Sequence, residues 1–472
     1  CMTKKSILAV SVLLALAAWL VPGSRAEAAQ VKFPDTNAGR RAAAYFKAYN
    51  TMKDEDMQAY LEANLAPEAI AKRSVQDRIQ ALQRIRTDAG TVEPQKILDA
   101  RDDAITLFVK GTTGKWFEWS FRFEKEAPGR LLGASIKMLD GPPDLDEPTT
   151  PLGPNEFLKQ IEARMGDLVA KDEFSGVVLV AKGGTALFEK AYGLASKEYG
   201  VPNRVDTRFN LGSLCKIITH IAVEQLAAKG ALALDDELGK FLPDYPNKEA
   251  AEKITIRELL DMTSGVGDFF GEKYDATPKN RIRNLADYLP LFASEPLLFE
   301  PGTKNQYSNG GYLLLGLIIE KASGQSYYDY VREHIYEPAG MKSTGHLEAD
   351  VPVENVASGY TLTWDGGDHA GEPRRNNIYT RPARGSSAGG GYSTVDDLLK
   401  LVLALKAGTF PAPETAGMFA GSGYYAGGAP GISAFVGTEP ATDCTIIVLS
   451  NYDPPTAVKT GNALAHLAKR LQ

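Results

Sequence analysis

The segment Asn210-Leu211-Gly212-Ser213-Leu214-Cys215-Lys216 decides how the rest of this sequence is interpreted. It contains the only Ser-x-x-Lys of the chain, and an apolar run without Gly or Pro follows it over residues 217–226. Such a run predicts a buried helix, and Gly230 stands where a glycine commonly ends one. The pattern therefore predicts Ser213 at the N-terminus of a buried helix, with Lys216 one turn further on and on the same face.

This placement has a chemical consequence for the two side chains. Free backbone N–H groups and the positive end of the helix dipole favour developing negative charge at Ser213. Burial removes water from the Lys216 ammonium and makes the neutral amine accessible, so that the amine can deprotonate the serine hydroxyl. The two residues are a candidate nucleophile and base. Taken alone, the stretch also fits an N-cap serine followed by a lysine that reaches solvent.

Composition bounds the remaining possibilities. The chain has 472 residues, 44% of them hydrophobic, which is enough for more than one core. A net charge of -7 argues against a nucleic-acid partner. Cys215 and Cys444 each lie in an apolar run, which favours buried thiols over a disulfide or a metal ligand. We expect no cofactor and no metal. The polar cluster that comes nearest to a metal site is more typical of solvated loop charges: Asp365, Asp368, His369 and Glu372.

The first 28 residues have the organisation of a signal peptide. Lys4-Lys5 is followed by an apolar stretch over residues 7–21, and Ala26-Glu27-Ala28 offers a cleavage site between small residues. The apolar stretch is short for a membrane span. We therefore expect a secreted or periplasmic protein that is cut near Ala28 and has no membrane span in its mature form. An uncleaved anchor is the alternative.

Residues 31–140 are predicted to form a small α+β domain. Helical patterns come first, over residues 42–49, 56–65 and 75–85. Strand patterns follow, and one of them places four aromatic residues on the same face: Phe117, Trp119, Phe121 and Phe123. Helices before an antiparallel sheet resemble the cone-shaped NTF2-like domains, although no motif carries that resemblance. The Pro-rich, acidic residues 141–154 are interpreted as a linker.

The remainder, residues 155–472, is predicted to be a larger α+β domain. Hairpins are expected over residues 175–191 and 432–449, with a helix before the first and after the second. The hairpins can share one antiparallel sheet that the terminal helices cover, while the mainly helical middle forms a subdomain beside it. A capping box, Ser393-Thr394-Val395-Asp396, is expected to open one of the helices. A crevice between the sheet and the subdomain would hold Ser213.

Three other stretches of this domain fit one pattern. Leu-Leu-Asp-Met-Thr-Ser-Gly over residues 259–265 precedes a loop, Tyr307-Ser308-Asn309 precedes an apolar helix, and Gly427-Gly428 precedes the last hairpin. Together with the Ser-x-x-Lys, they resemble the class C β-lactamase-related serine hydrolases, which include β-lactamases, D-Ala-D-Ala carboxypeptidases, D-aminopeptidases and family VIII esterases. The resemblance extends over roughly residues 155–472 and implies a β-lactamase/transpeptidase-like fold.

The resemblance assigns roles to individual residues. It implies that Ser213 is the nucleophile of an acyl-enzyme and that Lys216 is its partner. Tyr307 aligns with a tyrosine that assists proton transfer, and a phenol beside an ammonium has a stabilised phenolate. Asn309 aligns with an asparagine that orients the lysine and the substrate. The backbone N–H groups of Ser213 and Gly428 are implied as the oxyanion hole.

The third motif of the family departs from its usual form in this chain. Relatives have Lys-Thr-Gly or His-x-Gly, whereas Tyr425-Ala426-Gly427 stands here as the implied substrate-binding strand. Without a cation at the first position, we expect neutral acyl substrates, esters above all, rather than substrates with a carboxylate beside the scissile bond. An arginine of the upstream loop could compensate, the candidates being Arg374, Arg375, Arg381 and Arg384.

Two stretches spell catalytic motifs without the context that those motifs need. Lys459-Thr460-Gly461 runs into the last helix, whereas the third motif requires a strand. Gly385-Ser386-Ser387-Ala388-Gly389 matches Gly-x-Ser-x-Gly, but a nucleophile elbow needs an apolar strand before it and a helix directly after it. Both remain alternatives to the assignment above, and both are disfavoured.

Three functional interpretations follow. The first is a secreted serine hydrolase that acts on a small ester, amide or peptide substrate. The second is a sensor that keeps the fold and is acylated without turnover, and the third is a structural protein of the cell envelope. The intact set of Ser213, Lys216, Tyr307 and Asn309 favours the hydrolase, whereas Tyr425 leaves room for the sensor.

Overall fold

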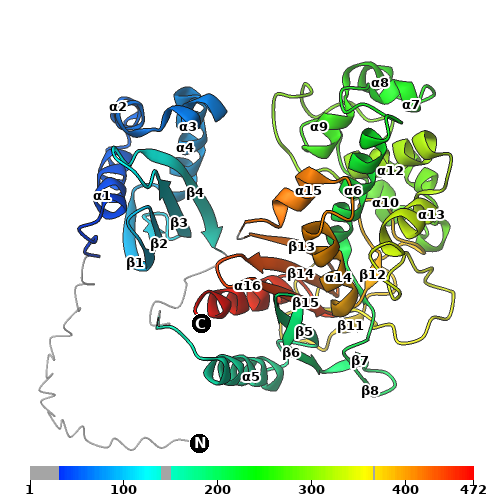
Figure 1. Ribbon diagram of the computed structural model, residues 1–472. Coiled ribbons are helices and arrows are strands. Elements are labelled where there is room, and N and C mark those ends of the chain that lie inside the picture. Colours follow the sequence, from blue (N-terminus) through cyan, green and yellow to red (C-terminus); the bar gives the residue numbers. More distant parts are fainter. Residues whose placement is uncertain (1–30, 140–149, 365–366, 422) are drawn as a thin grey trace, which may run out of the picture. The chain divides into compact units, whose positions relative to one another are not determined.

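The structure is a computed structural model that describes residues 31–139, 150–364, 367–421 and 423–472 (Figure 1). These residues form two compact units, and the division lies between Thr149 and Thr150. The predicted signal peptide, and the predicted linker up to residue 149, lie outside the described residues. Within the described ranges, no helix has both the length and the apolar character needed to cross a membrane.

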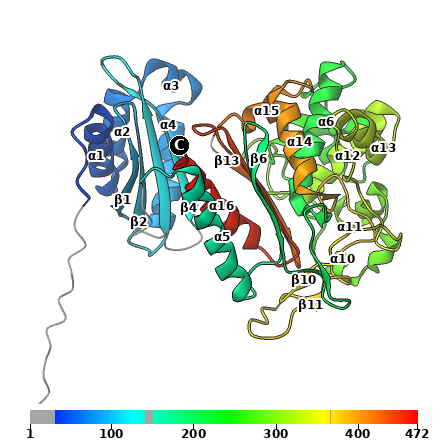
Figure 2. The same ribbon diagram turned by 60° about the horizontal axis from the view of Figure 1, so that its bottom comes forward.

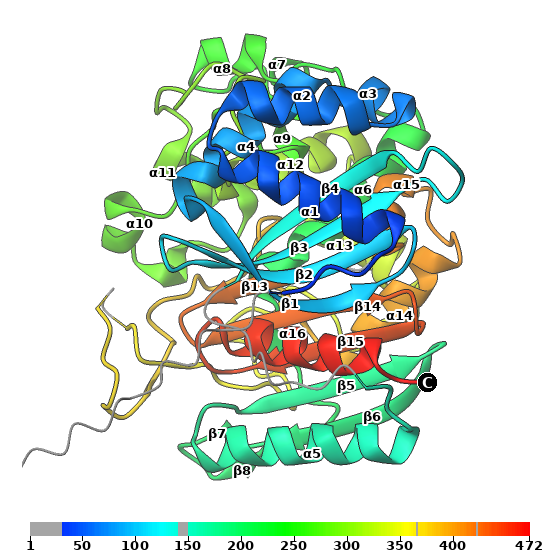
Figure 3. The ribbon, with the colours of Figure 1, turned by 90° about the vertical axis from the view of Figure 1, so that its left-hand side faces the viewer.

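The first unit packs helices against a four-stranded antiparallel sheet of order β1-β2-β3-β4. Helix α1 crosses the strands of this sheet (Figure 3). The aromatic side chains predicted to share one face of β3 are all buried, and Trp119 lies 5.2 Å from the ring of Tyr49 on α1. The elements are α1 (Asn37–Asn50), α2 (Asp54–Asn64), α3 (Pro67–Lys72), α4 (Val75–Ala89), β1 (Val92–Ala100), β2 (Ala104–Gly111), β3 (Trp116–Phe123) and β4 (Leu131–Leu139).

The second unit is organised around a five-stranded antiparallel sheet of order β13-β14-β15-β5-β6. Its strands are β5 (Gly176–Lys182), β6 (Thr185–Tyr192), β13 (Gly423–Ala429), β14 (Ile432–Glu439) and β15 (Cys444–Ser450). Because β15 pairs with β5, the first and last hairpins share one sheet, as the sequence predicts. Strand β13 is the edge strand that carries the third motif.

Both faces of this sheet are covered, and alternate residues of each central strand pack on opposite sides. Val178 and Val180 of β5 pack with the terminal helices α5 (Pro154–Ala170) and α16 (Thr456–Lys469), whereas Val177 and Leu179 pack with the helical subdomain. Figure 2 shows the two terminal helices along one face and α14 (Val395–Lys406) with α6 (Lys216–Ala228) on the other. Coverage on both faces explains why β5 and β15 are continuous apolar runs rather than alternating ones.

The helical subdomain is built on two helices that are apolar nearly all round. These are α6 and α12 (Asn309–Ser323), and their residues are buried along most of both helices. Gly230 follows α6 with a φ of +71°, in the left-handed region that glycine adopts readily. The shorter helices are α7 (Leu238–Phe241), α8 (Lys248–Lys253), α9 (Ile256–Leu260), α10 (Glu272–Ala276), α11 (Leu289–Phe292), α13 (Tyr327–Val331), α15 (Pro413–Met418), η1 (Gly212–Cys215), η2 (Lys279–Arg281), η3 (Leu285–Tyr288) and η4 (Arg332–Tyr336).

Short strands tie the long loops of this unit together. They are β7 (Leu194–Ser196), β8 (Val201–Pro202), β9 (Phe209–Asn210), β10 (Tyr360–Thr361), β11 (Arg375–Asn376) and β12 (Tyr392–Ser393). One of them corrects the predicted capping box: Ser393 pairs with Phe209, so the N-cap of α14 is Thr394, whose hydroxyl accepts from the backbone N–H of Asp397. The helix therefore begins at Val395, and its N-cap, Thr394, lies one residue after the first residue of the predicted capping box.

Candidate active site

Ser213 lies in the short 3-10 helix η1, and Lys216 is the first residue of α6. The backbone enters this turn through Gly212, whose φ of +51° suits a glycine. The predicted helix N-terminus is thus present, but its first turn is tighter than an α-helix. The turn places the serine hydroxyl and the lysine ammonium on the same side, and Lys216 Nζ lies 3.2 Å from Ser213 Oγ.

Four of the predicted site residues meet around Lys216. Its Nζ donates to Asn309 Oδ1 over 2.7 Å and to the backbone oxygen of Ala388 over 2.5 Å. Tyr307 Oη donates to Ser213 Oγ over 2.6 Å. The structure therefore brings Ser213, Lys216, Tyr307 and Asn309 together although 93 residues separate Lys216 from Asn309 in the sequence.

Burial determines the charge on Lys216. The residue is 7% exposed, and loss of hydration lowers the pKa of its ammonium to about 7, while the neighbouring Cys215 and Asp268 oppose this shift. A neutral amine has two N–H groups and one lone pair. Lys216 Nζ donates to Ser213 Oγ as well as to the carbonyl oxygens of Asn309 and Ala388. When the lysine loses a proton, the two carbonyl oxygens can keep its two remaining N–H groups, and the lone pair becomes available to the serine hydroxyl. In its neutral form Lys216 is a candidate proton acceptor for the serine.

Tyr307 differs from the sequence-based expectation of a stabilised phenolate. Burial raises the pKa of its phenol, the nearby Asp268 adds to the increase, and the hydrogen bond with Ser213 only partly opposes it. A lysine whose pKa is lowered to about 7 is neutral above that pH and then supplies no positive charge to stabilise a phenolate. Tyr307 is thus a protonated phenol that donates a hydrogen bond to Ser213 Oγ.

Two groups of this arrangement were missed by reasoning from the sequence. Asp268 Oδ2 accepts from Asn309 Nδ2 over 2.7 Å, which turns the amide oxygen of Asn309 toward Lys216. The other group is the backbone oxygen of Ala388. Asp268 lies in a loop with no motif of its own, and a backbone oxygen has no residue signature, so neither carried a signal in the sequence.

The third motif crosses the nucleophile turn at backbone contact distance. A side chain on Gly427 would lie 1.9 Å from the backbone oxygen of Leu211 and 2.9 Å from the N–H nitrogen of Ser213. Conversely, a side chain on Gly212 would lie 2.8 Å from the nitrogen of Gly428. Glycine at these positions therefore lets the backbone of β13 approach the backbone of η1 closely.

The remaining sequence-predicted residues are placed as follows. Ala426 and Gly427 line the cavity beside Ser213, whereas Tyr425 is not among its lining residues. The Tyr425 ring is half-buried and lies 5.3 Å from Phe419, and burial raises the pKa of its phenol to about 12. The motif letters Lys459-Thr460-Gly461 lie inside α16, where Gly461 packs on the ring of Phe435. The strand context of the third motif is therefore found at β13.

The stretch that resembles a nucleophile elbow has another position. Ser387 is fully buried, and its backbone oxygen accepts from the hydroxyl of Thr219. Its neighbours Ser386 and Ala388 form the cavity wall, and Ala388 holds Lys216. The Gly-x-Ser-x-Gly letters thus mark the wall of the Ser213 site. Within the described parts of the chain, no group of His, Cys, Asp and Glu is arranged to hold a metal ion.

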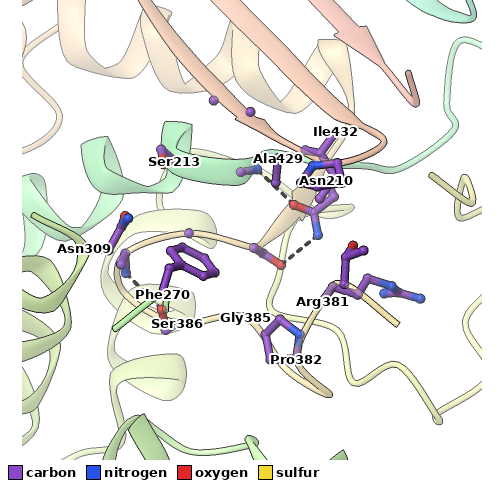
Figure 4. Close-up of a pocket in the computed structure, with 18 of the residues that line it drawn as sticks. Asn210, Ser213, Phe270, Asn309, Arg381, Pro382, Gly385, Ser386, Ala429 and Ile432 are labelled. Carbon is purple, nitrogen blue, oxygen red and sulfur yellow. Dashed lines mark hydrogen bonds between the residues drawn. The ribbon is translucent and has the colours of Figure 1, made fainter. Parts of the chain in front are cut away.

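A cavity of about 590 Å³ opens beside Ser213, a volume typical of sites for small molecules. Figure 4 shows Ser213 and Asn309 on one side of it and Arg381 with Pro382 on the other. Aromatic side chains on and beside α10, together with residues of β13 and of the loop before β12, form much of its wall. Of the four loop arginines considered from the sequence, Arg381 is the one that lines the cavity.

Comparisons with known proteins agree with this architecture. The sequence model of the Beta-lactamase family matches residues 161–470. The chain is 36% identical to penicillin-binding protein 4* of Bacillus subtilis over 188 residues, which are 39% of this chain and 41% of that protein. It is 33% identical to esterase EstB of Burkholderia gladioli over 264 residues, 51% of this chain and 67% of EstB. The chain thus spans less than half of the first relative and two thirds of the second.

Solved structures show the same fold. The penicillin binding protein of Bacillus halodurans aligns with a TM-score of 0.57 and 29% identity, over 65% of this chain and 98% of that protein. A D-amino acid amidase of Ochrobactrum anthropi aligns with a TM-score of 0.54 and 23% identity, over 67% of this chain and 97% of that one. Because the family match extends over more than half of the chain and this fold accompanies it, the chain belongs to the beta-lactamase family.

Proposed function

We propose that this protein is a serine hydrolase that cleaves esters or amides of small molecules through an acyl-enzyme on Ser213. One observation carries the proposal: Ser213 Oγ lies between Tyr307 Oη at 2.6 Å and Lys216 Nζ at 3.2 Å, and burial lowers the pKa of that lysine to about 7. A hydroxyl held between a proton donor and a neutral amine is an activated nucleophile. The adjoining cavity gives it access to a small substrate.

Acylation would use each group once. The Lys216 amine takes the hydroxyl proton as Ser213 Oγ bonds to the substrate carbonyl carbon, and the N–H groups of Ser213 and Gly428 hold the resulting oxyanion. Collapse of this intermediate breaks the bond to the leaving group, which takes the Tyr307 proton. The proton held by Lys216 then neutralises Tyr307. Water reverses the sequence in deacylation: it loses a proton to the amine, attacks the acyl carbon and releases the acid.

The names of the relatives support acyl transfer to water as the reaction class, but they do not identify the substrate of this protein. One relative of 33% identity is named an esterase, and others are named penicillin-binding proteins. Esters are the more reactive acyl compounds, so we expect ester hydrolysis to be the easiest activity to detect. The signal-peptide pattern of residues 1–28 supports the further proposal that the enzyme acts after export, as a secreted or periplasmic protein.

Hydrolysis of a short-chain nitrophenyl ester tests the proposal. Ser213→Ala should lower kcat/KM by at least about 1,000-fold because the covalent path is removed. Ser387→Ala is the matched control, since this serine is buried outside the cavity lining and should leave the rate nearly unchanged. Full activity of Ser213→Ala would refute the proposal. A single burst of nitrophenol without turnover would favour the acylated sensor instead.

A further inference from the structure

The cavity beside Ser213 combines an apolar wall with one charged side chain. Much of the wall comes from Phe269, Phe270, Leu347, Pro382, Pro430 and Ile432. Of all the residues that line the cavity, Arg381 alone is charged, and no acidic side chain belongs to the lining. In the close-up, Arg381 and Ser213 stand on opposite sides of the cavity (Figure 4). A ligand attached to Ser213 that follows the cavity therefore extends along apolar surface toward Arg381.

Arg381 lacks the partners that the other arginines of this loop have. Arg374 pairs with Asp453, Arg375 stacks on Trp364 at 4.2 Å, and Arg384 lies over Tyr328 and faces Glu348. By contrast, Arg381 makes no ion pair with any residue that the structure describes. Its Nη1 donates to Tyr392 Oη over 2.6 Å, and its Nε is buried without a hydrogen-bond partner.

This situation costs free energy that a ligand can recover. A buried N–H without a partner carries a desolvation penalty, and a guanidinium without a counter-ion in an apolar cavity carries another. A carboxylate is suited to offset the second cost, because its two oxygens match the guanidinium geometry and its single charge balances the single cation. A dianionic phosphate would leave an excess negative charge against the apolar wall.

We propose that Arg381 binds a carboxylate at the far end of the acyl group, so that the preferred substrates are apolar esters or amides of a dicarboxylic acid. Tyr307, which gives its proton to the leaving group in the proposed reaction, lines the cavity and is 50% exposed, so we assign the leaving group to the exposed part beside Tyr307 and the acyl group to the part toward Arg381. The inference rests on the proposed function. It also replaces the expectation, drawn from Tyr425, that the acyl group is uncharged. The other part of that expectation is kept, because the proposed carboxylate lies far from the scissile bond.

Matched pairs of nitrophenyl esters test this assignment. Adipate, suberate and sebacate monoesters are compared with hexanoate, octanoate and decanoate esters in wild type, Arg381→Gln and Arg381→Lys. We expect the wild type to favour a dicarboxylate at one chain length. In the Arg381→Gln variant, the ratio of kcat/KM for the dicarboxylate monoester to kcat/KM for the neutral ester should fall about 10- to 100-fold, chiefly because KM for the dicarboxylate rises. The Arg381→Lys variant should retain part of this preference.

Controls separate this inference from the hydrolase proposal. Arg375→Gln removes the same charge from the same loop outside the cavity and should keep the preference. A wild type that favours the neutral ester at every chain length would overturn the inference. An Arg381→Gln variant whose kcat/KM falls equally for the dicarboxylate monoester and the neutral ester would overturn it as well. Hydrolysis that survives in Ser213→Ala would instead refute the proposed function, whatever the role of Arg381.

Discussion

At the scale of single residues, the proposed reaction depends on the neutral form of a buried lysine. Desolvation of Lys216 outweighs the attraction of nearby negative groups and brings the pKa of its ammonium to about 7. Asp268 acts on this residue in two ways: it orients Asn309 through a 2.7 Å hydrogen bond, and its charge opposes the drop in the lysine pKa. The Asp268 carboxylate thus orients the amide of Asn309 and also keeps the pKa of Lys216 from falling further.

The first prediction concerns the pH dependence of acylation. A base with a pKa near 7 is neutral above that pH and protonated below it, so kcat/KM should be flat above pH 7 and fall about tenfold per pH unit below it. Removal of the Asp268 charge, as in Asp268→Asn, should move the midpoint to lower pH. The exposed Asp275→Asn should leave it in place. A profile that is flat from pH 5 to pH 9 would contradict a catalytic Lys216.

The same scale shows why the sequence predicted part of the site. Ser213, Lys216, Tyr307 and Asn309 lie in motifs whose spacing and neighbours differ from chance, and the structure brings all four together. Three further groups reach the site only because loops distant in the sequence fold around it: Asp268, the backbone oxygen of Ala388, and Arg381. Their residue types in the sequence matched many other loop residues, so a pattern could not single them out.

At the scale of elements, the decisive contact is the crossing of β13 and η1. Apolar runs of strand length, separated by short turns, predicted the sheet, and the runs are continuous because each central strand buries both faces. The cap of α14 was placed one residue early, since pairing of Ser393 with Phe209 depends on a strand far away in the sequence. Long-range pairing of short segments is what local patterns do not contain.

The second prediction tests this crossing. Gly427→Ala would bring a methyl group to 1.9 Å from Leu211 O, with backbone on both sides, so β13 must move away from η1. We expect kcat/KM to fall by about 100- to 1,000-fold, as on loss of one oxyanion donor, and unfolding free energy to fall by about 1–3 kcal/mol. Gly423→Ala on the same strand meets open space and should change neither quantity appreciably. Equal behaviour of the two variants would contradict the close approach.

At the scale of the whole molecule, the chain consists of two compact units with separate hydrophobic cores. The core of the first unit contains the aromatic face of β3, and the cores of the second unit lie on the two faces of its sheet. All residues of the candidate site belong to the second unit. Leu152 pairs with Leu471, so the second unit encloses its own first residues.

The third prediction follows from this division. A chain of residues 150–472 should fold and hydrolyse a short nitrophenyl ester with the kcat/KM of the full chain, because every group of the site is present. Thermal unfolding of the full chain should show a second transition that the shortened chain lacks. A shortened chain that folds cooperatively but loses activity would show that the first unit completes the site.

Covalent labelling tests the central claim, that Ser213 is the nucleophile, more directly than any rate. The protein is incubated with a fluorophosphonate, digested, and the modified residue is located by mass spectrometry. The account predicts one label per chain, on Ser213, and a slower reaction in Lys216→Ala because the amine no longer takes the hydroxyl proton. Labelling of Ser387 or Ser264 with Ser213 unmodified would contradict it.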